Sequence, residues 1–135
     1  MRPRFIRQRS ARKGAALVEF AVTLPIILLV VFATIEICTC YGLQQSLKVA
    51  AYQGCRVGLS AESTQDIVER QTRFVLDARG IKSYVISISA DPTTLSTNDF
   101  LTVQVNAPTG SNLPLTSWVV GDRNISTSVS MMTER

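Results

Sequence analysis

Three residues near the N-terminus have types and a spacing that could do chemistry: Gly14, Ala15 and Glu19. Glycine readily adopts the extended backbone that a protease needs at a scissile bond, so the Gly14–Ala15 bond is a candidate cleavage site. Cleavage there would leave an α-amine on Ala15. Glu19 follows four residues later, so a helix would place its carboxylate on the same face as that amine. The predicted chemistry is proteolytic processing followed by formation of a charge pair.

Two other arrangements are open for Glu19. A carboxylate at the border of an apolar helix is costly unless it is paired or reaches water, and Arg12 and Lys13 stand close by in the sequence. Glu19 could simply lie in the lipid headgroup region, neutralised by these two cations. Alternatively, it could pair with the amine of a neighbouring subunit, which would align one subunit against another.

Other kinds of chemistry have little support in the sequence. The chain has no histidine, so conventional Ser-His-Asp and Cys-His arrangements are excluded and a zinc site lacks its usual ligands. No glycine-rich phosphate-binding loop occurs. Asp91, Asp99 and Asp122 could gather around a cation, but acids scattered over loops are usually solvated. We therefore expect no enzyme activity, no cofactor and no metal site.

The three cysteines cannot all pair within one chain. On a helix, Cys38 and Cys40 point to nearly opposite sides, and Cys40 and Cys55 would be about 22 Å apart. Neither pair can close as a disulfide within a helix. We expect small apolar residues at a helix interface, with an intermolecular bridge in an oxidising periplasm as the alternative.

Positive charge is concentrated ahead of the apolar segment. Residues 1–13 carry six of the 14 basic side chains, and no acid precedes Glu19. The six are Arg2, Arg4, Arg7, Arg9, Arg12 and Lys13. The positive-inside rule explains residues 1–14 as a leader that stays in the cytoplasm while the next segment inserts. Nucleic-acid binding is not expected, because no second basic patch with interleaved aromatic residues follows.

Residues 15–36 are expected to cross a membrane as a helix. Residues 15–35 would be roughly 31 Å long, about the hydrocarbon thickness of a bilayer. Glu36 stands where a signal-peptidase site would need a small residue, so we expect no cleavage after the span. Pro25 removes one backbone donor and should kink or loosen the helix near Ala21.

The helical pattern continues over residues 37–59. Ala50, Gly54 and Gly58 recur every four residues and form a smooth stripe on one face. Such a stripe lets a neighbouring element approach closely. Two partners are equally open: the chain's own fold or another subunit.

Residues 60–135 are expected to form a small periplasmic α+β domain. A second helix is predicted over residues 63–80, with a capping box of Ser63 and Asp66 and a stop at Gly80. Its predicted core-facing residues are Ile67, Phe74, Val75 and Ala78.

Three later segments alternate apolar and polar residues as strands do. They are centred on residues 84–88, 101–105 and 125–131. The Asp91-to-Asp99 connection suits a hairpin, so the first two strands should pair antiparallel. One apolar face per strand predicts a roughly three-stranded antiparallel sheet that a helix covers on one side. The long connection over residues 106–122 should place Trp118 in the core, with an exposed docking role as the alternative.

The N-terminal pattern resembles the processing site of type IV pilins and pseudopilins. A basic leader, Gly14, the run AALVEF and an apolar span follow one another in that order. More narrowly, GAALVEFAVTLPIILLVVFATIE with the later LQQSLKVAAYQGCRVG is similar to the TadE-like pseudopilins of tight adherence (Tad) pilus systems. The resemblance covers residues 12–58 and does not explain the cysteines at positions 38 and 55.

The resemblance implies a function and a set of partners. In that family a prepilin peptidase cuts after the glycine, here Gly14, and a glutamate stands one helical turn beyond, here Glu19 followed by Phe20. The chain would be a minor pilin or pseudopilin of a Tad-type (type IVc) pilus, acting in assembly, adhesion and biofilm formation. Its partners would be the peptidase, other pilin or pseudopilin subunits, the Tad inner-membrane assembly platform and membrane lipid. Its length exceeds that of the major pilins, which favours an accessory role.

The implied location is the bacterial inner membrane, crossed once, with the N-terminus cytoplasmic and the C-terminal domain periplasmic. Whether the protein enters the pilus is left open. The alternative function is a signal-anchored periplasmic binding or regulatory domain that is never processed. The mature N-terminus distinguishes the two, because Ala15 indicates a pilin and Met1 indicates an anchor.

Overall fold

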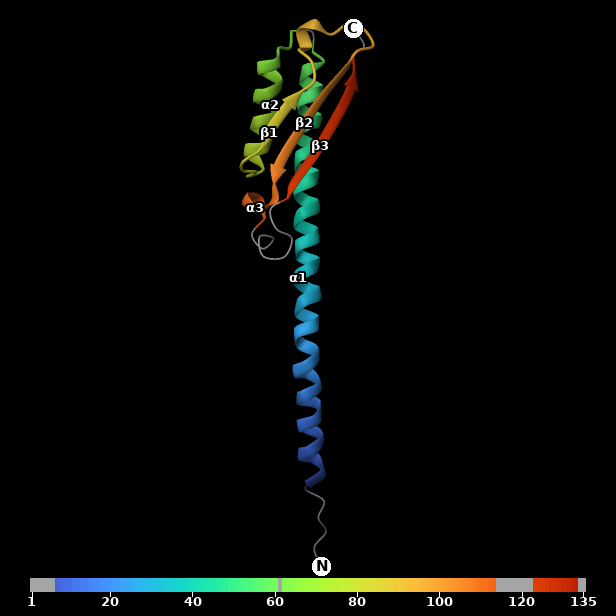
Figure 1. Ribbon diagram of the computed structural model, residues 1–135, viewed down its shortest axis with the longest axis vertical. Helices are drawn as coiled ribbons and strands as arrows, with labels where there is room; N and C mark the ends of the chain where they lie inside the picture. The colour runs from blue at the N-terminus through green and yellow to red at the C-terminus, as the bar shows by residue number, and fades with distance from the viewer. Residues whose placement is uncertain (1–6, 61, 114–122, 134–135) are drawn as a thin grey trace, which may run out of the picture. The chain divides into compact units, whose positions relative to one another are not determined.

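A computed structural model of the chain describes residues 7–60, 62–113 and 123–133 (Figure 1). The chain divides into two compact units, Met1–Ile37 and Cys38–Arg135. The first contains the N-terminal part of helix α1, and the second contains the rest of α1, further helices and a sheet. The predicted α+β class is confirmed: a long apolar N-terminal helix, a second helix and a three-stranded antiparallel sheet.

Helix α1 runs from Arg7 to Gly58. Within the described part of the chain, its Gly14–Gly58 portion is the one helix long and apolar enough to cross a membrane. The leucine, isoleucine, valine and phenylalanine side chains from Leu17 to Ile35 are exposed. Length and composition therefore support a span, and the described residues of the first unit offer these side chains no core.

The second unit contains the sheet, in the order β1-β2-β3 with both pairs antiparallel. The strands are β1 (Val85–Ile88), β2 (Phe100–Pro108) and β3 (Asn124–Met132). β1 and β2 form the predicted hairpin, and the short 3-10 helix η1 (Pro92–Thr94) lies in the loop between them. β2 and β3 pair along nine residues each without a bulge.

The two faces of the sheet differ as the alternating pattern predicts. On β2, alternate side chains are buried, and they pack with side chains of α1 and α2 in one core. The buried β2 residues are Leu101, Val103, Val105 and Ala107, and the helical core residues include Leu43, Leu47, Ala50, Ala51, Cys55, Val68 and Leu76. Mostly polar side chains occupy the other face, where the hydroxyls of Thr102 and Ser130 are 2.7 Å apart, and the exposed apolar residues Val85, Phe100 and Met132 lie at its ends.

Helix α2 (Gln65–Ala78) buries a different face from the predicted one. Val68, Thr72 and Leu76 are fully buried, whereas Phe74 is 68% exposed. The prediction that Ile67, Phe74 and Ala78 face the core is wrong, because all three are exposed. The fourth predicted residue, Val75, does pack against the core.

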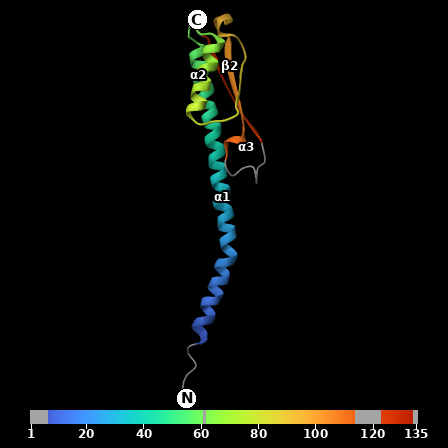
Figure 2. The ribbon, with the colours of Figure 1, turned by 90° about the vertical axis from the view of Figure 1, so that its left-hand side faces the viewer.

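The stripe of small residues on α1 gives the physical reason. A Cβ added at Gly54 would lie 2.2 Å from Thr72 Oγ1, and one added at Gly58 would lie 2.3 Å from Leu101 Cδ2 and 3.0 Å from Val68 Cγ2. The glycines therefore let α2 and β2 approach the C-terminal part of α1, beside which α2 lies (Figure 2). Two partners were left open for this stripe, and at Gly54 and Gly58 the partner is the chain's own fold, namely α2 and β2.

The two ends of α2 were predicted with unequal success. Thr64, not Ser63, occupies the N-cap position and makes no side-chain capping bond, so the predicted capping box with Asp66 is wrong. The predicted stop at Gly80 is confirmed, because its φ is 69° and its N–H donates to the carbonyl of Asp77 at 2.9 Å.

The connection expected over residues 106–122 begins later than predicted. β2 continues to Pro108, since the strand keeps pairing with β3 as far as Asn124. The short helix α3 (Thr109–Asn112) follows. Residues 114–122 lie outside the described part of the chain, so the prediction for Trp118 is not tested.

Candidate functional site

The predicted processing residues lie on one face of α1. Helix α1 already begins at Arg7, so the Gly14–Ala15 bond falls inside it. A shallow groove along the helix is lined by Gly14, Ala15, Val18, Glu19, Val22 and Thr23. The helix therefore presents the candidate scissile bond and the Glu19 carboxylate along the same strip of surface.

Gly14 has no packing role among the side chains that the structure describes in the first unit. A Cβ added there would meet no described atom within 4 Å beyond the backbone of its own helix turn, in contrast to Gly54 and Gly58. Glycine is less favourable than alanine inside a helix by roughly 0.5–1 kcal/mol, so Gly14 weakens α1 at this point. A protease that needs an extended substrate would unwind the helix most easily here.

Glu19 and Phe20 are both exposed on α1. Glu19 makes no ion pair with any side chain that the structure describes, and the side chains of Arg12 and Lys13 lie outside that set. The hydroxyl of Thr23 donates to the carbonyl of Glu19 at 3.0 Å. The pairing of the Glu19 carboxylate therefore stays a prediction.

Pro25 lies inside α1, and the helix continues on both sides of it. Its ring removes the N–H that would otherwise donate to the carbonyl of Ala21. The kink near Ala21 stays a prediction.

The three cysteines are free and differ in environment. Cys55 is buried in the core, and its thiol lies 3.1 Å from the carbonyl of Val129. Burial raises the pKa of the Cys55 thiol, which disfavours the reactive thiolate. Cys55 therefore fits the interpretation as a small interface residue. Cys38 is exposed and Cys40 is partly buried, so an intermolecular bridge through Cys38 stays a prediction.

The loop acids serve the hairpin connection. Asp91 accepts hydrogen bonds from the backbone N–H and the hydroxyl of Thr93, and these bonds lower the pKa of its carboxyl. Asp99 accepts from the N–H of Ser96 at 2.8 Å. Asp122 lies outside the described residues. Over the ranges that the structure does describe, no three His, Cys, Asp or Glu side chains gather where a metal could bind.

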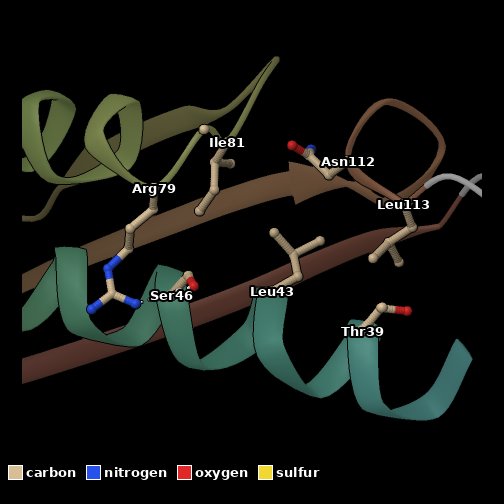
Figure 3. Close-up of a pocket in the computed structure, with 8 residues that line it drawn as sticks. Thr39, Leu43, Ser46, Arg79, Ile81, Asn112 and Leu113 are labelled. Carbon is tan, nitrogen blue, oxygen red and sulfur yellow. Dashed lines mark hydrogen bonds between the residues drawn. The ribbon is translucent and has the colours of Figure 1, made fainter. Parts of the chain in front are cut away.

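A second cleft, which sequence reasoning missed, lies in the Cys38–Arg135 unit (Figure 3). Its lining residues are Thr39, Leu43, Ser46, Arg79, Gly80, Ile81, Asn112 and Leu113. Its walls bond to one another, since Arg79 Nη1 donates to Ser46 Oγ at 3.3 Å and Asn112 Oδ1 accepts from the N–H of Lys82 at 2.7 Å. The cleft joins three separate elements, so no local pattern in the sequence could have found it.

Comparison with known proteins gives one finding. Residues 14–56 match the family model described as TadE-like protein. No curated protein and no solved structure matches the chain. The match begins at Gly14 and includes the apolar segment, Pro25 and Gly54. The predicted resemblance to TadE-like pseudopilins is thereby confirmed for these residues.

Proposed function

We propose, from the match of residues 14–56 to the TadE-like family, that this protein is a minor pilin or pseudopilin of a Tad-type pilus. The observation that carries the proposal is that the match starts at the glycine of the candidate cleavage site and runs through an exposed apolar helix. Adhesion and biofilm formation would follow from the pilus that the protein helps to assemble.

The precursor would insert with residues 1–14 in the cytoplasm and residues 15–36 in the inner membrane. The cluster of basic residues ahead of the span favours this orientation. The C-terminal domain would then face the periplasm. The assembly platform and the peptidase would meet the helix at the cytoplasmic side of the membrane, where Gly14 lies.

Processing would convert an anchored precursor into a subunit. A prepilin peptidase would cut between Gly14 and Ala15, which removes the cationic leader and exposes an ammonium group on Ala15. The Glu19 carboxylate, which no described side chain pairs, would then bind this ammonium or that of a neighbouring subunit. Phe20 and the other exposed apolar side chains would contact lipid first and neighbouring subunits after assembly.

The first test is the mature N-terminus. Coexpression with a prepilin peptidase should shorten the chain so that mass spectrometry and N-terminal sequencing find Ala15 first. Gly14→Leu should block the cut, because the bulky side chain occupies the position that the protease must accept. Gly42→Leu is the matched control, since Gly42 lies in the same helix with open space around it and should leave processing unchanged.

Two results would contradict the processing step. A chain that keeps Met1 in peptidase-competent cells would support the alternative of an unprocessed, signal-anchored periplasmic domain. Equal cleavage of the Gly14→Leu and Gly42→Leu variants would place the cut elsewhere.

The second test separates the charge pair from the cut. Glu19→Ala should still be processed, but it should reduce the number of pili several-fold, because the new ammonium loses its partner. Glu19→Asp keeps the charge and should restore part of the loss. Electron microscopy of pili in a complemented deletion strain measures the effect. Normal piliation with Glu19→Ala would refute the pairing without affecting the assignment of Gly14.

A further inference from the structure

Strand β3 forms one edge of the sheet, and within the described residues this edge has none of the usual protection against pairing with another strand. It has nine residues, Asn124–Met132, with no charged residue, proline or glycine among them. Within the described part of the chain it pairs with β2 alone, and that pairing has no bulge. Native sheets normally protect such edges with charges, proline, bulges or very short strands.

The opposite margin of the same sheet shows the contrast. β1 has only four residues, contacts α2, and is preceded by Ser83 in a left-handed conformation with φ 56°. The residue just before β1 is also bonded to α2, because the hydroxyl of Tyr84 donates to Asp77 Oδ1 at 2.7 Å. β1 is thus a poor template for another strand, whereas β3 is a good one.

The alternation of hydrogen bonds along the β2–β3 pair shows which backbone groups of β3 face away from β2. The N–H of Thr133 donates to the carbonyl of Asp99 at 2.8 Å, and the carbonyl of Arg123 accepts from Thr109 at 2.7 Å. Odd-numbered residues therefore bond to β2, and even-numbered residues turn their N–H and C=O groups away from it. The outward-facing residues are Asn124, Ser126, Ser128, Ser130 and Met132.

A groove lies between α1 and β3, beside this edge of the sheet. It is lined by Gln45, Lys48, Val49 and Tyr52 of α1 and by Val129 of β3. Tyr52 is 45% exposed and Val129 is only partly covered, so apolar side chains of an added strand would have a surface to pack on. Lys48 and Arg56 are exposed one turn to either side of Tyr52 and give this face a positive charge.

We infer that the free edge of β3 docks an extended segment of a different polypeptide, which adds to the sheet as a fourth strand. The outward N–H and C=O groups select an extended backbone, the groove selects apolar side chains at alternate positions, and Lys48 and Arg56 select acidic flanks. A second copy of β3 fits less well, because its nine residues carry no acid and each of its flanking acids, Asp122 and Glu134, stands next to an arginine that offsets its charge. This surface is separate from the processing site at Gly14, so each proposal can fail alone.

Binding of a designed peptide to the full chain in detergent micelles tests the inference. The probe is a labelled nine-residue peptide of alternating valine and threonine with glutamate at both ends, and its twin carries lysine at both ends. Fluorescence anisotropy should show saturable binding of the glutamate peptide. Hydrogen exchange should show new protection at Ser126, Ser128 and Ser130.

Two variants locate the binding site. Ser128→Pro removes one outward N–H and leaves the β2 ladder intact, so affinity should fall by about tenfold or more. Ser128→Ala keeps the N–H and should bind as the parent does. Lys48→Glu should weaken the glutamate peptide and favour the lysine peptide, each by about threefold or more. Lys48 is exposed, so this variant carries the test if Ser128→Pro fails to fold.

Several outcomes would overturn the inference. These are the absence of binding, equal affinity for both peptides in parent and Lys48→Glu, or a folded Ser128→Pro variant that binds normally. Sedimentation that shows the parent to be a dimer, which the glutamate peptide dissociates, would assign the edge to a second copy instead.

Discussion

Leu29 and Leu47 belong to the same helix, yet Leu29 is 69% exposed and Leu47 is completely buried. Between Leu17 and Ile35, α1 is mostly apolar, and its large apolar side chains find no cover among the described residues of their own unit. The stretch after Cys38 is amphipathic and contributes residues such as Ala50 and Cys55 to the core of the second unit. The same hydrophobic effect therefore acts on different partners in the two stretches.

This difference separates two uses of one helix. In the second stretch, burial of apolar surface stabilises the chain's own fold, at about 25 cal/mol per Å². In the first stretch the same kind of surface packs against none of the described residues of its own unit, and its length and composition suit a membrane span. Substitutions should therefore affect folding in one stretch and assembly or insertion in the other.

The largest expected contrast comes from one substitution made in both stretches. Leu47→Ala should lower the free energy of unfolding of the C-terminal domain by about 2–5 kcal/mol, because it leaves a cavity in a packed core. Leu29→Ala should change it by less than about 0.5 kcal/mol. Denaturant unfolding of the full chain in detergent, followed by near-ultraviolet circular dichroism, measures both. Equal losses would mean that the first stretch also packs on the domain.

A smaller contrast comes from two glycines of α1. Gly54→Ala places a Cβ against Thr72, whereas Gly42→Ala enters open space. Both gain the same helix propensity, so their difference isolates the packing cost, which should be about 1–3 kcal/mol against Gly54→Ala. Thermal unfolding of the two variants measures this difference. If they are equally stable, the close approach of α2 at Gly54 is wrong.

The smallest contrast concerns tyrosines. Burial, and then the hydrogen bond to Asp77, raises the pKa of Tyr84 above its ordinary value. The neutral phenol is therefore favoured in the folded state. Its contribution is fully present below the unfolded pKa of about 10 and is lost as pH rises through the folded pKa. Tyr84→Phe should cost about 0.5 kcal/mol near neutral pH.

Measurement of stability against pH checks the sign of this effect. The parent should lose stability relative to Tyr84→Phe as the solution becomes more alkaline than about pH 10. Tyr52→Phe is the control, since Tyr52 is exposed and donates to no described residue. A constant gap between parent and Tyr84→Phe across this range would contradict the assignment.

Local patterns predicted a large part of the fold. Alternation along residues 101–105 and 125–131 predicted strands whose apolar side faces the core, and both are found. Gly80 predicted the end of α2, because only a residue that tolerates positive φ suits that position. These features depend on a few neighbouring residues, so the sequence was sufficient to find them.

The wrong predictions concern residues whose burial depends on elements far away in the sequence. Phe74 was assigned to the core by its apolar character, but α2 turns Val68 and Thr72 toward α1, because the glycines there leave room for them. Ser63 was assigned a capping role, but its side chain is buried and Thr64 takes the N-cap position. In both cases packing against a partner far away in the sequence outweighed the local signal.

The sequence by itself determined the order of basic N-terminal segment, Gly14, Glu19 and apolar helix, because charge and hydropathy along a single helix need no tertiary partner to be interpreted. Only the tertiary structure decided which face of α2 is buried, which cysteine is inaccessible and which strands form the edges of the sheet. Those properties depend on close contacts between segments many residues apart, and a linear pattern does not record how such segments meet.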